Sequence, residues 1–186
     1  VSAVAESAGD TRAVEMVKDG LTVYRCKSVG QTDTQTYKLD YPAFESSDAT
    51  LASYLTQTVA EPLLALRKID AMSAENAYTA DTKDSVRISF FASLEFDGIL
   101  SLEASVSNRA ADLSVNEMLF FYRIIDLAQR RELTVYDLFN EQRDVVDVAI
   151  RNAVFTIQNG QGLAIVGDAS QVPAPNSFYL TKAVFR

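Results

Sequence analysis

The residue types that carry most enzyme chemistry are sparse in this chain of 186 residues. The sequence contains no histidine and a single cysteine, Cys26. Without histidine, Ser-His-Asp and Cys-His nucleophilic sites are excluded, and the usual zinc and non-haem iron sites lose their commonest ligand. One cysteine cannot form an intrachain disulfide, and in a strand-like run it is typically a small buried side chain. We therefore expect no catalytic residues, no metal site and no cofactor.

Two aspartates flank one turn and are the best-placed pair of carboxylates. Asp126 ends an apolar run, and Asp137 follows it after the polar residues 128–132. Such a pair can do acid–base work or hold a cation. The simpler interpretation is that Asp126 ends a strand and that Asp137 caps a helical turn together with Thr134. A hydrolase that uses a serine with Lys83 as its base is a further alternative, but no motif supports it.

Arginines form a small basic island in an acidic protein. Arg130, Arg131 and Arg143 could hold a carboxylate or an anionic glycan through forked hydrogen bonds, or they could lie on a solvated hairpin tip. The glycines of residues 160–162 follow a predicted helix instead of preceding one. They therefore indicate a helix end and a turn, and not a phosphate-binding loop.

Composition and charge limit the classes of partner. The chain has 17 basic and 25 acidic residues, a formal net charge of −8, and 48% hydrophobic residues. A protein that neutralises phosphates needs a basic field, so we expect no nucleic acid partner. No stretch approaches 18 consecutive apolar residues, so we expect no membrane-spanning segment. The composition is that of an ordinary globular protein.

Strand patterns dominate the elements that would position these residues. Residues 119–127 are aromatic and β-branched throughout, which predicts a central strand covered on both faces. Residues 86–96 alternate apolar and polar side chains, Asp97-Gly98 is a favoured hairpin turn, and residues 100–106 continue the alternation. Residues 21–27 and 36–41 alternate in the same way and predict a second hairpin.

Two amphipathic helices complete the predicted fold. Apolar residues recur at helical spacing from Leu51 to Leu66, after Ser47 or Asp48 as the cap, and Pro62 predicts a kink or a restart near residues 60–61. A second helix is predicted over 144–157. We therefore predict an α+β fold, an antiparallel sheet with two main helices packed on one face. Residues 1–18 are predicted as a flexible N-terminal arm, with an edge strand as the alternative over 1–15. Residues 19–186 are predicted as a single α+β domain with an N-terminal portion (19–84) and a C-terminal portion (85–186).

Several pieces, in this order, resemble a bacterial extracytoplasmic domain of unknown function. It occurs in the ectodomain of the lysozyme-sensing anti-sigma-V factor and in the non-catalytic region of peptidoglycan deacetylases. The matching pieces are Tyr41-Pro42, the hairpin of residues 96–102, Tyr122 to Asp126, the residues Leu133-Thr134-Val135-Tyr136-Asp137-Leu138-Phe139, and Asn176 to Thr181. The family often has Gly-Gly-Ala-His where this chain has residues 108–112, without glycine or histidine.

The resemblance implies a non-catalytic binding or sensing module of a bacterial envelope protein, which is not an enzyme. It implies an extracytoplasmic location, as a periplasmic, lipoprotein or secreted protein whose leader is absent from this chain. The possible ligand is a basic protein such as lysozyme, and the alternative is an accessory domain that presents peptidoglycan or another glycan to a cell-wall enzyme. The ligand would bind the sheet face or the loops 107–117 and 168–177, and the candidate binding residues are Phe91, Arg109, Asp112, Asn116, Arg130, Arg131 and Tyr179.

Overall fold

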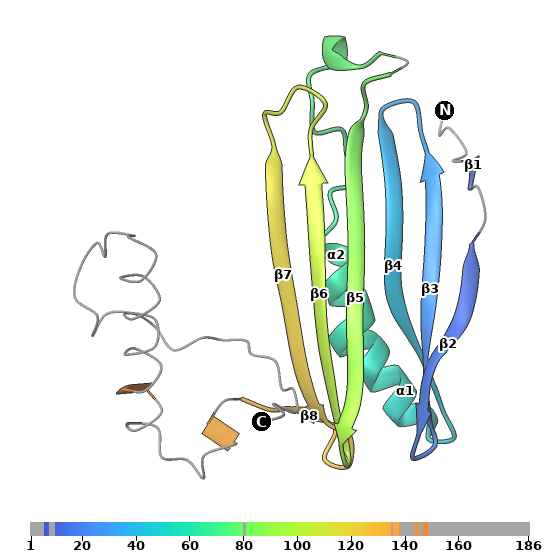
Figure 1. Ribbon diagram of the computed structural model, residues 1–186, viewed down its shortest axis with the longest axis vertical. Helices are drawn as coiled ribbons and strands as arrows, with labels where there is room; N and C mark the ends of the chain where they lie inside the picture. Colours follow the sequence, from blue (N-terminus) through green and yellow to red (C-terminus); the bar gives the residue numbers. More distant parts are fainter. Residues whose placement is uncertain are drawn as a thin grey trace, which may run out of the picture.

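One curved sheet and one helix make up the part of the chain that the structure describes (Figure 1). This computed structural model describes residues 6–7, 10–79, 81–134, 136–137, 144 and 147–148. The sheet order is β1-β3-β4-β5-β6-β7-β8, and β2 pairs with the same edge of β3 as β1. The strands are β1 (Glu6–Ser7), β2 (Thr11–Lys18), β3 (Leu21–Gln31), β4 (Gln35–Ser46), β5 (Asp84–Phe96), β6 (Ile99–Arg109), β7 (Asn116–Asp126) and β8 (Arg131–Glu132).

The sheet is mostly antiparallel, but one pair of strands departs from the predicted pattern. β4 and β5 run parallel, and they pair only from Gln35 with Asp84 to Leu39 with Ile88. The chain between them forms the helix and a long loop, and this crossover returns it to the same end of the sheet. The prediction of a purely antiparallel sheet was therefore wrong at this pair.

Tight turns fix the antiparallel hairpins. Asp19 and Gly20 join β2 to β3 with φ angles of 53° and 77°, the left-handed pair that a two-residue turn of this kind requires. Asp97-Gly98 joins β5 to β6, and there only Gly98 has a positive φ, of 71°. The predicted β5–β6 hairpin is confirmed with its turn, and its alternation is confirmed as far as Ser93, after which a register shift before Phe96 interrupts it.

The helix begins at its predicted cap and changes geometry before its proline. Asp48 accepts hydrogen bonds from the backbone N–H groups of Thr50 and Leu51, at 2.9 and 3.2 Å, and so caps α1 (Ala49–Leu55). A π-helical turn, η1 (Thr56–Ala60), leads without interruption into α2 (Glu61–Ala65). Pro62 has no backbone N–H to donate. The turn before it is wider than an α-helical turn and accommodates the proline without ending the helix. The helix therefore changes from π to α geometry near residues 60–61, where a kink or a restart was predicted, but it does not restart.

A single main helix is present in the described part of the chain, where the sequence predicted two. The second predicted helix, 144–157, falls almost entirely outside the described residues; residues 144, 147 and 148 are described and helical. The remaining regular piece is a short 3₁₀ turn, η2 (Glu75–Ala77), in the loop before β5.

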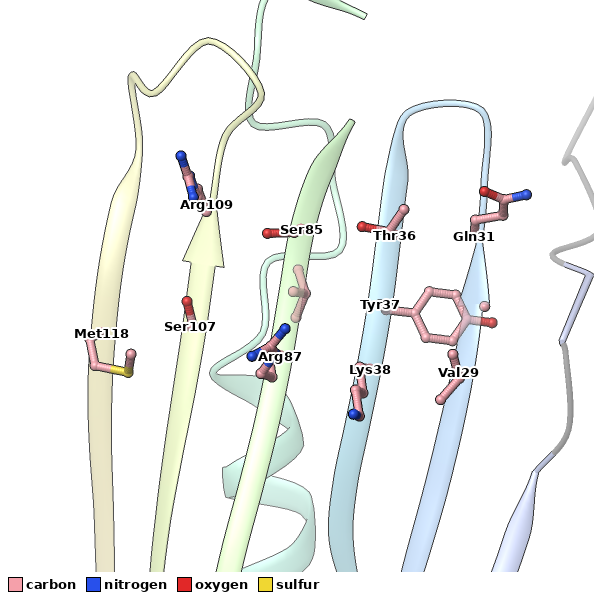
Figure 2. Close-up of a pocket in the computed structure, with 12 residues that line it drawn as sticks. Val29, Gln31, Thr36, Tyr37, Lys38, Ser85, Arg87, Ser107, Arg109 and Met118 are labelled. Carbon is pink, nitrogen blue, oxygen red and sulfur yellow. The ribbon is translucent and has the colours of Figure 1, made fainter. Parts of the chain in front are cut away.

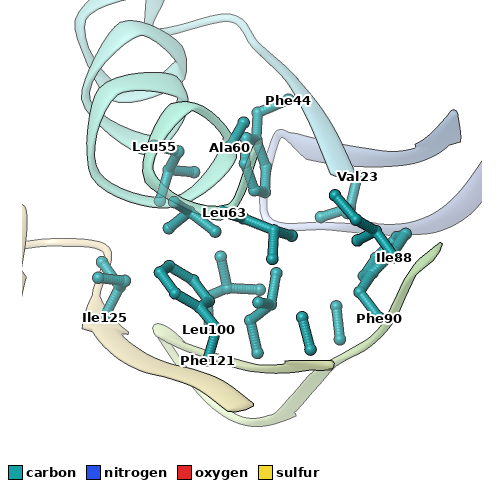
Figure 3. Close-up of a cluster of buried hydrophobic side chains, with 14 of the residues drawn as sticks. Val23, Phe44, Leu55, Ala60, Leu63, Ile88, Phe90, Leu100, Phe121 and Ile125 are labelled. Atoms are coloured by element: carbon teal, nitrogen blue, oxygen red, sulfur yellow. The ribbon is translucent and has the colours of Figure 1, made fainter. Parts of the chain in front are cut away.

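The core lies between the helix and one face of the sheet (Figure 3). Leu55, Val59 and Leu63 of the helix are completely buried. They pack in one cluster with the predicted inward faces of β5 and β6, which are Val86, Ile88, Phe90, Ala92, Leu100, Leu102, Ala104 and Val106. The opposite face of β5, β6 and β7 carries no helix in the described structure.

β7 differs most from its predicted environment. The run 119–127 was expected to be central and covered on both faces, but β7 lies next to the short strand β8, which pairs only with Ile125 and Asp126. Phe121 is buried with the core, whereas Met118 and Phe120 are 57% and 61% exposed. The predicted burial of both faces was wrong because a sequence does not show which face of the sheet an aromatic side chain occupies, and aromatic residues are usually assigned to the core.

The N-terminal residues are more ordered than predicted. Residues 11–18, which the sequence analysis placed in a flexible arm, form β2 and pair with β3 from Lys18–Leu21 to Thr11–Lys27. The sheet irregularity between Val14 and Met16 marks a bulge in this edge strand.

Two cationic side chains connect the halves of the sheet where β4 and β5 separate. Arg25 of β3 donates to the carbonyl of Phe90 at 3.2 Å, and its guanidinium lies 4.4 Å from the Phe90 ring centroid. Lys18 of β2 donates to the carbonyl of Leu94 at 2.9 Å and to the carboxylate of Asp97 at 2.8 Å. These side chains take the place of a neighbouring strand for β5 carbonyls that would otherwise lack a backbone partner.

Candidate ligand-binding site

A cavity of about 980 Å³ lies where β3 to β7 come side by side, at the end of the sheet that holds the parallel pair (Figure 2). Strand register places its residues in rows. In one row Val29 lies opposite Lys38, Lys38 beside Arg87, Arg87 opposite Ser107 and Ser107 opposite Met118. Partners in register share one face of a sheet, so five strands contribute neighbouring side chains. The next row is Gln31, Thr36, Ser85 and Arg109.

Positive charge is the main feature of this cavity. Lys38, Arg87 and Arg109 line it, all three are exposed, and no carboxylate is among the described residues that line it. None of the three forms an ion pair with another described residue. In a chain of net charge −8, three unpaired cations on one concave surface create a local positive field. The arrangement is suited to an anion, because guanidinium groups hold carboxylates and phosphates through forked hydrogen bonds.

A buried aspartate fixes the loops behind this end of the sheet. Asp84, the first residue of β5, is completely buried and accepts four hydrogen bonds. The donors are the Ser73 hydroxyl at 2.6 Å, the Met72 N–H at 2.7 Å, the Tyr78 hydroxyl at 2.8 Å and the Ala111 N–H at 2.9 Å. Burial alone would raise the pKa of Asp84, but these hydrogen bonds outweigh it and hold the pKa below its ordinary value. Asp84 is thus a structural anion and not a general base.

Asn108 fixes the end of the helix in the same region. It is completely buried in β6, donates to the carbonyl of Leu66 at 3.0 Å and accepts from the N–H of Lys68 at 3.1 Å. Together, Asp84 and Asn108 anchor the loop after the helix to the strand ends that carry Ser85 and Arg109. The cavity is therefore built on a rigid support.

The structure brings only some of the predicted binding residues to the cavity. Arg109 lines it, and Asn116 lies opposite Arg109 in the β6–β7 register. Asp112 lies in the turn between these strands, where it accepts from the N–H and the hydroxyl of Ser114 at 2.9 and 2.5 Å. These hydrogen bonds hold the pKa of Asp112 below its ordinary value, and they indicate a role in the turn.

The other predicted binding residues lie elsewhere. Phe91 is 52% exposed on the same sheet face, farther along β5. Arg130 and Arg131 belong to the far end of the sheet, where they pair with Asp48 and Asp137. Tyr179 lies outside the described residues, as do Arg143 and the loop 168–177.

Sequence reasoning missed Lys38 and Arg87. Both residues occupy polar positions in strands that alternate apolar and polar side chains. This position was the only feature of the sequence that could have indicated a role for either residue. Their proximity depends on the parallel pairing of β4 with β5, which brings residues about fifty positions apart into one row.

The aspartate pair has the structural role that the simpler interpretation gave it. Asp126 accepts from the N–H of Gln129 at 2.8 Å and ends its strand in a turn. Asp137 accepts from the hydroxyl and the N–H of Thr134, at 2.7 and 2.6 Å, and from Arg131 at 2.8 Å. The hydrogen bonds from Thr134, followed by that from Arg131, lower the pKa of Asp137 to about 2. Among the described residues no cluster of three or more acidic or cysteine side chains could hold a metal ion.

The described helices include none that is long and apolar enough to cross a membrane. No protein-family profile matches the chain, and no curated protein is significantly similar to it. The chain is similar to the crystal structure of a DUF3298 family protein from Pseudomonas aeruginosa, at 17% identity and a TM-score of 0.45, over 77% of this chain and 72% of that one. It is also similar to a DUF3298 family member from Bacteroides fragilis, at 10% identity and a TM-score of 0.43, over 84% of this chain and 72% of that one. Both neighbours are bacterial proteins described as members of the DUF3298 family.

Proposed function

We propose that this chain is a non-catalytic binding module and that its sheet-face cavity takes an anionic ligand. The observation that carries the proposal is the set of three cations, Lys38, Arg87 and Arg109, that share one cavity without a carboxylate among its described lining residues. Hydrogen bonds between charged groups contribute about 1.5–3 kcal/mol each, so two or three of them give useful affinity for a carboxylate-bearing ligand.

The cellular setting follows from the family resemblance. We propose an extracytoplasmic module of a bacterial envelope protein, in which the ligand is a component of the cell wall. Peptidoglycan carries carboxylates on its peptide stems, so it fits a cationic cavity. The charge of the cavity thus favours the glycan-binding alternative over recognition of a basic protein at this face.

Reversing the cavity charge tests the proposal. We expect the unaltered chain to sediment with insoluble peptidoglycan, and Arg87→Glu and Arg109→Glu each to weaken retention by roughly tenfold or more, because each removes a charged hydrogen bond. Arg12→Glu is the matched control. It makes the same change in net charge, and Arg12 lies over the ring of Tyr24 on the opposite face of β3. Equal retention of all three variants, or none by the unaltered chain, would contradict the proposal.

A basic protein partner is the second candidate, because the chain as a whole carries a net charge of −8. Capture of the chain on immobilised lysozyme tests this candidate function. In this case Arg87→Glu should strengthen capture or leave it unchanged, since the added acid increases the attraction for a cationic protein. The same variant therefore separates the two candidate functions, because it weakens retention by peptidoglycan and does not weaken capture on lysozyme.

A further inference from the structure

A strip of small side chains continues from the cationic cavity along β6. It consists of Ser105 and Ser107, which point to the face that carries no helix in the described structure. Strand register gives the neighbours of this serine strip. Ser89 of β5 and Phe120 of β7 flank Ser105, and Arg87 and Met118 flank Ser107. The cavity is lined by Ser107 and by its neighbours Arg87 and Met118, so the cavity and the serine strip form one continuous surface.

Large apolar side chains beside the serine strip are in contact with solvent. Phe120 is 61% exposed, Met118 57% and Phe91 52%. The rings of Phe120 and Tyr122 lie 6.4 Å apart and nearly parallel, at 17°, and so present one broad apolar surface. The hydroxyls of Ser89 and Ser105 lie 2.8 Å apart. Exposed apolar side chains gathered on one face are typical of an interaction surface.

The chemistry of the serine strip distinguishes between kinds of ligand. β6 is paired with β5 on one side and with β7 on the other over most of its length, so its backbone has no free edge for an extended peptide to join. Sugar rings need no backbone edge. Their apolar C–H faces pack on aromatic rings, and their hydroxyls exchange hydrogen bonds with serine hydroxyls.

We propose that the serine strip and the aromatic side chains beside it bind an oligosaccharide that bears carboxylates, with its sugar rings along Ser105 and Phe120 and one carboxylate in the cavity at Arg87. The inference rests on the proposed function, because the cavity is its anionic end. It adds the class of ligand, an acidic glycan of several residues, and a second set of contacts that the cavity lacks. Glu103, in register between Phe91 and Tyr122, places an acid at the far end and so sets the direction in which an anionic chain can lie.

Calorimetric titration with two sugar acids tests the inference on the full chain. The probes are galacturonic acid, which carries the carboxylate alone, and tetragalacturonate, which adds rings; cellotetraose is the neutral control. We expect the tetramer to bind at least tenfold more tightly than the monomer, and cellotetraose to bind more weakly than the tetramer. Phe120→Ala should lower the affinity for the tetramer about tenfold and leave that for the monomer unchanged. Arg87→Glu should weaken both.

The variants and a peptide probe separate the possible failures. Phe120 is exposed, so Phe120→Ala should fold normally, and Ile69→Ala, at another exposed apolar side chain (70%), is its control. If the tetramer binds no better than the monomer, or if Phe120→Ala binds it normally, the inference is wrong while the proposed function stands. The same holds if an oligoglutamate peptide binds in an Arg87-dependent way and the tetramer does not. If no soluble anionic probe binds, the inference is wrong, and the proposed function is wrong as well if insoluble peptidoglycan does not retain the chain.

Discussion

At the scale of single residues, the structure separates carboxylates that hold the fold from cations that are free to act. Asp84, Asp112 and Asp137 have their oxygens engaged by nearby donors, and the pKa of each is lowered. Lys38, Arg87 and Arg109 have no carboxylate partner within the described part of the chain. A sequence shows charged residue types but not their partners, so Arg109 was predicted as a binding residue and Arg87 was not.

Replacing Asp84 should weaken the fold in a pH-dependent way. Asp84→Asn removes a buried anion that accepts four hydrogen bonds, and we expect the free energy of unfolding at pH 7 to fall by about 1–3 kcal/mol. Because the folded pKa is lowered, the stabilisation by the charged form is present at neutral pH and is lost as the pH falls below about 4. Urea unfolding of the unaltered chain and of Asp84→Asn at pH 7 and pH 3 measures the difference in their free energies of unfolding. A difference that does not shrink at pH 3 would contradict this account.

The pKa of Asp137 should be measurably low and should depend on one neighbour most. NMR titration of its side-chain carboxyl is expected to give a value of about 2. Thr134→Val removes the hydroxyl donor and should raise the pKa more than Arg131→Ala does, since the Thr134 hydrogen bond is the larger cause. An equal or reversed order of the two variants would show that the ion pair dominates instead.

At the scale of elements, the sequence predicts what local patterns determine. The β5–β6 hairpin was predicted correctly because its alternation extends through both strands and its turn has Gly98 where φ is positive. The helix cap and the irregularity before Pro62 were predicted for the same reason. The environments of the two faces of β7 were not predicted correctly. Phe120 and Phe121 are the same residue type, but Phe120 is exposed and Phe121 is buried.

The helix cap supports a prediction at this scale. Asp48→Ala removes the acceptor for two backbone N–H groups, and we expect a loss of about 1 kcal/mol in the free energy of unfolding. Asp48→Ser restores the cap without the contact to Arg130 and should recover most of that loss. Arg130→Ala is the control for the exposed ion pair and should cost little. Thermal denaturation of the three variants ranks their stabilities. A larger loss of stability in Arg130→Ala than in Asp48→Ala would contradict the prediction.

At the scale of the whole molecule, the two halves of the sheet meet through a short seam and a few side chains. Arg25 contacts Glu15 and Asp40 at 2.7 Å each and reaches the Phe90 carbonyl across the gap between β4 and β5. One oxygen of Asp40, Oδ1, is buried without a described hydrogen-bond partner. No local pattern in the sequence predicted this cluster, because its members come from four strands. Pairing of neighbouring strands brings Glu15, Arg25 and Asp40 together, and Phe90 lies across the gap on β5.

Removing Arg25 should therefore destabilise the whole domain. Arg25→Ala leaves two half-buried carboxylates next to each other, and we expect the free energy of unfolding to fall by about 2 kcal/mol. Adding Asp40→Asn to Arg25→Ala should recover part of the loss, because the repulsion between the carboxylates is removed. Denaturant unfolding of both variants tests this. If the second substitution deepens the loss, the cluster does not act through charge.

The parallel seam between β4 and β5 also has a kinetic consequence. The strands on either side of it, β2–β3–β4 and β5–β6–β7, are joined by short connections, so each set can form from contacts close in sequence. The seam closes a loop that contains the helix and the linker after it, and long loops are closed late and slowly. The folding rate of this domain should therefore be limited by the docking of two preassembled ribbons, and the amides of residues 37–39 should be the last to become protected during refolding.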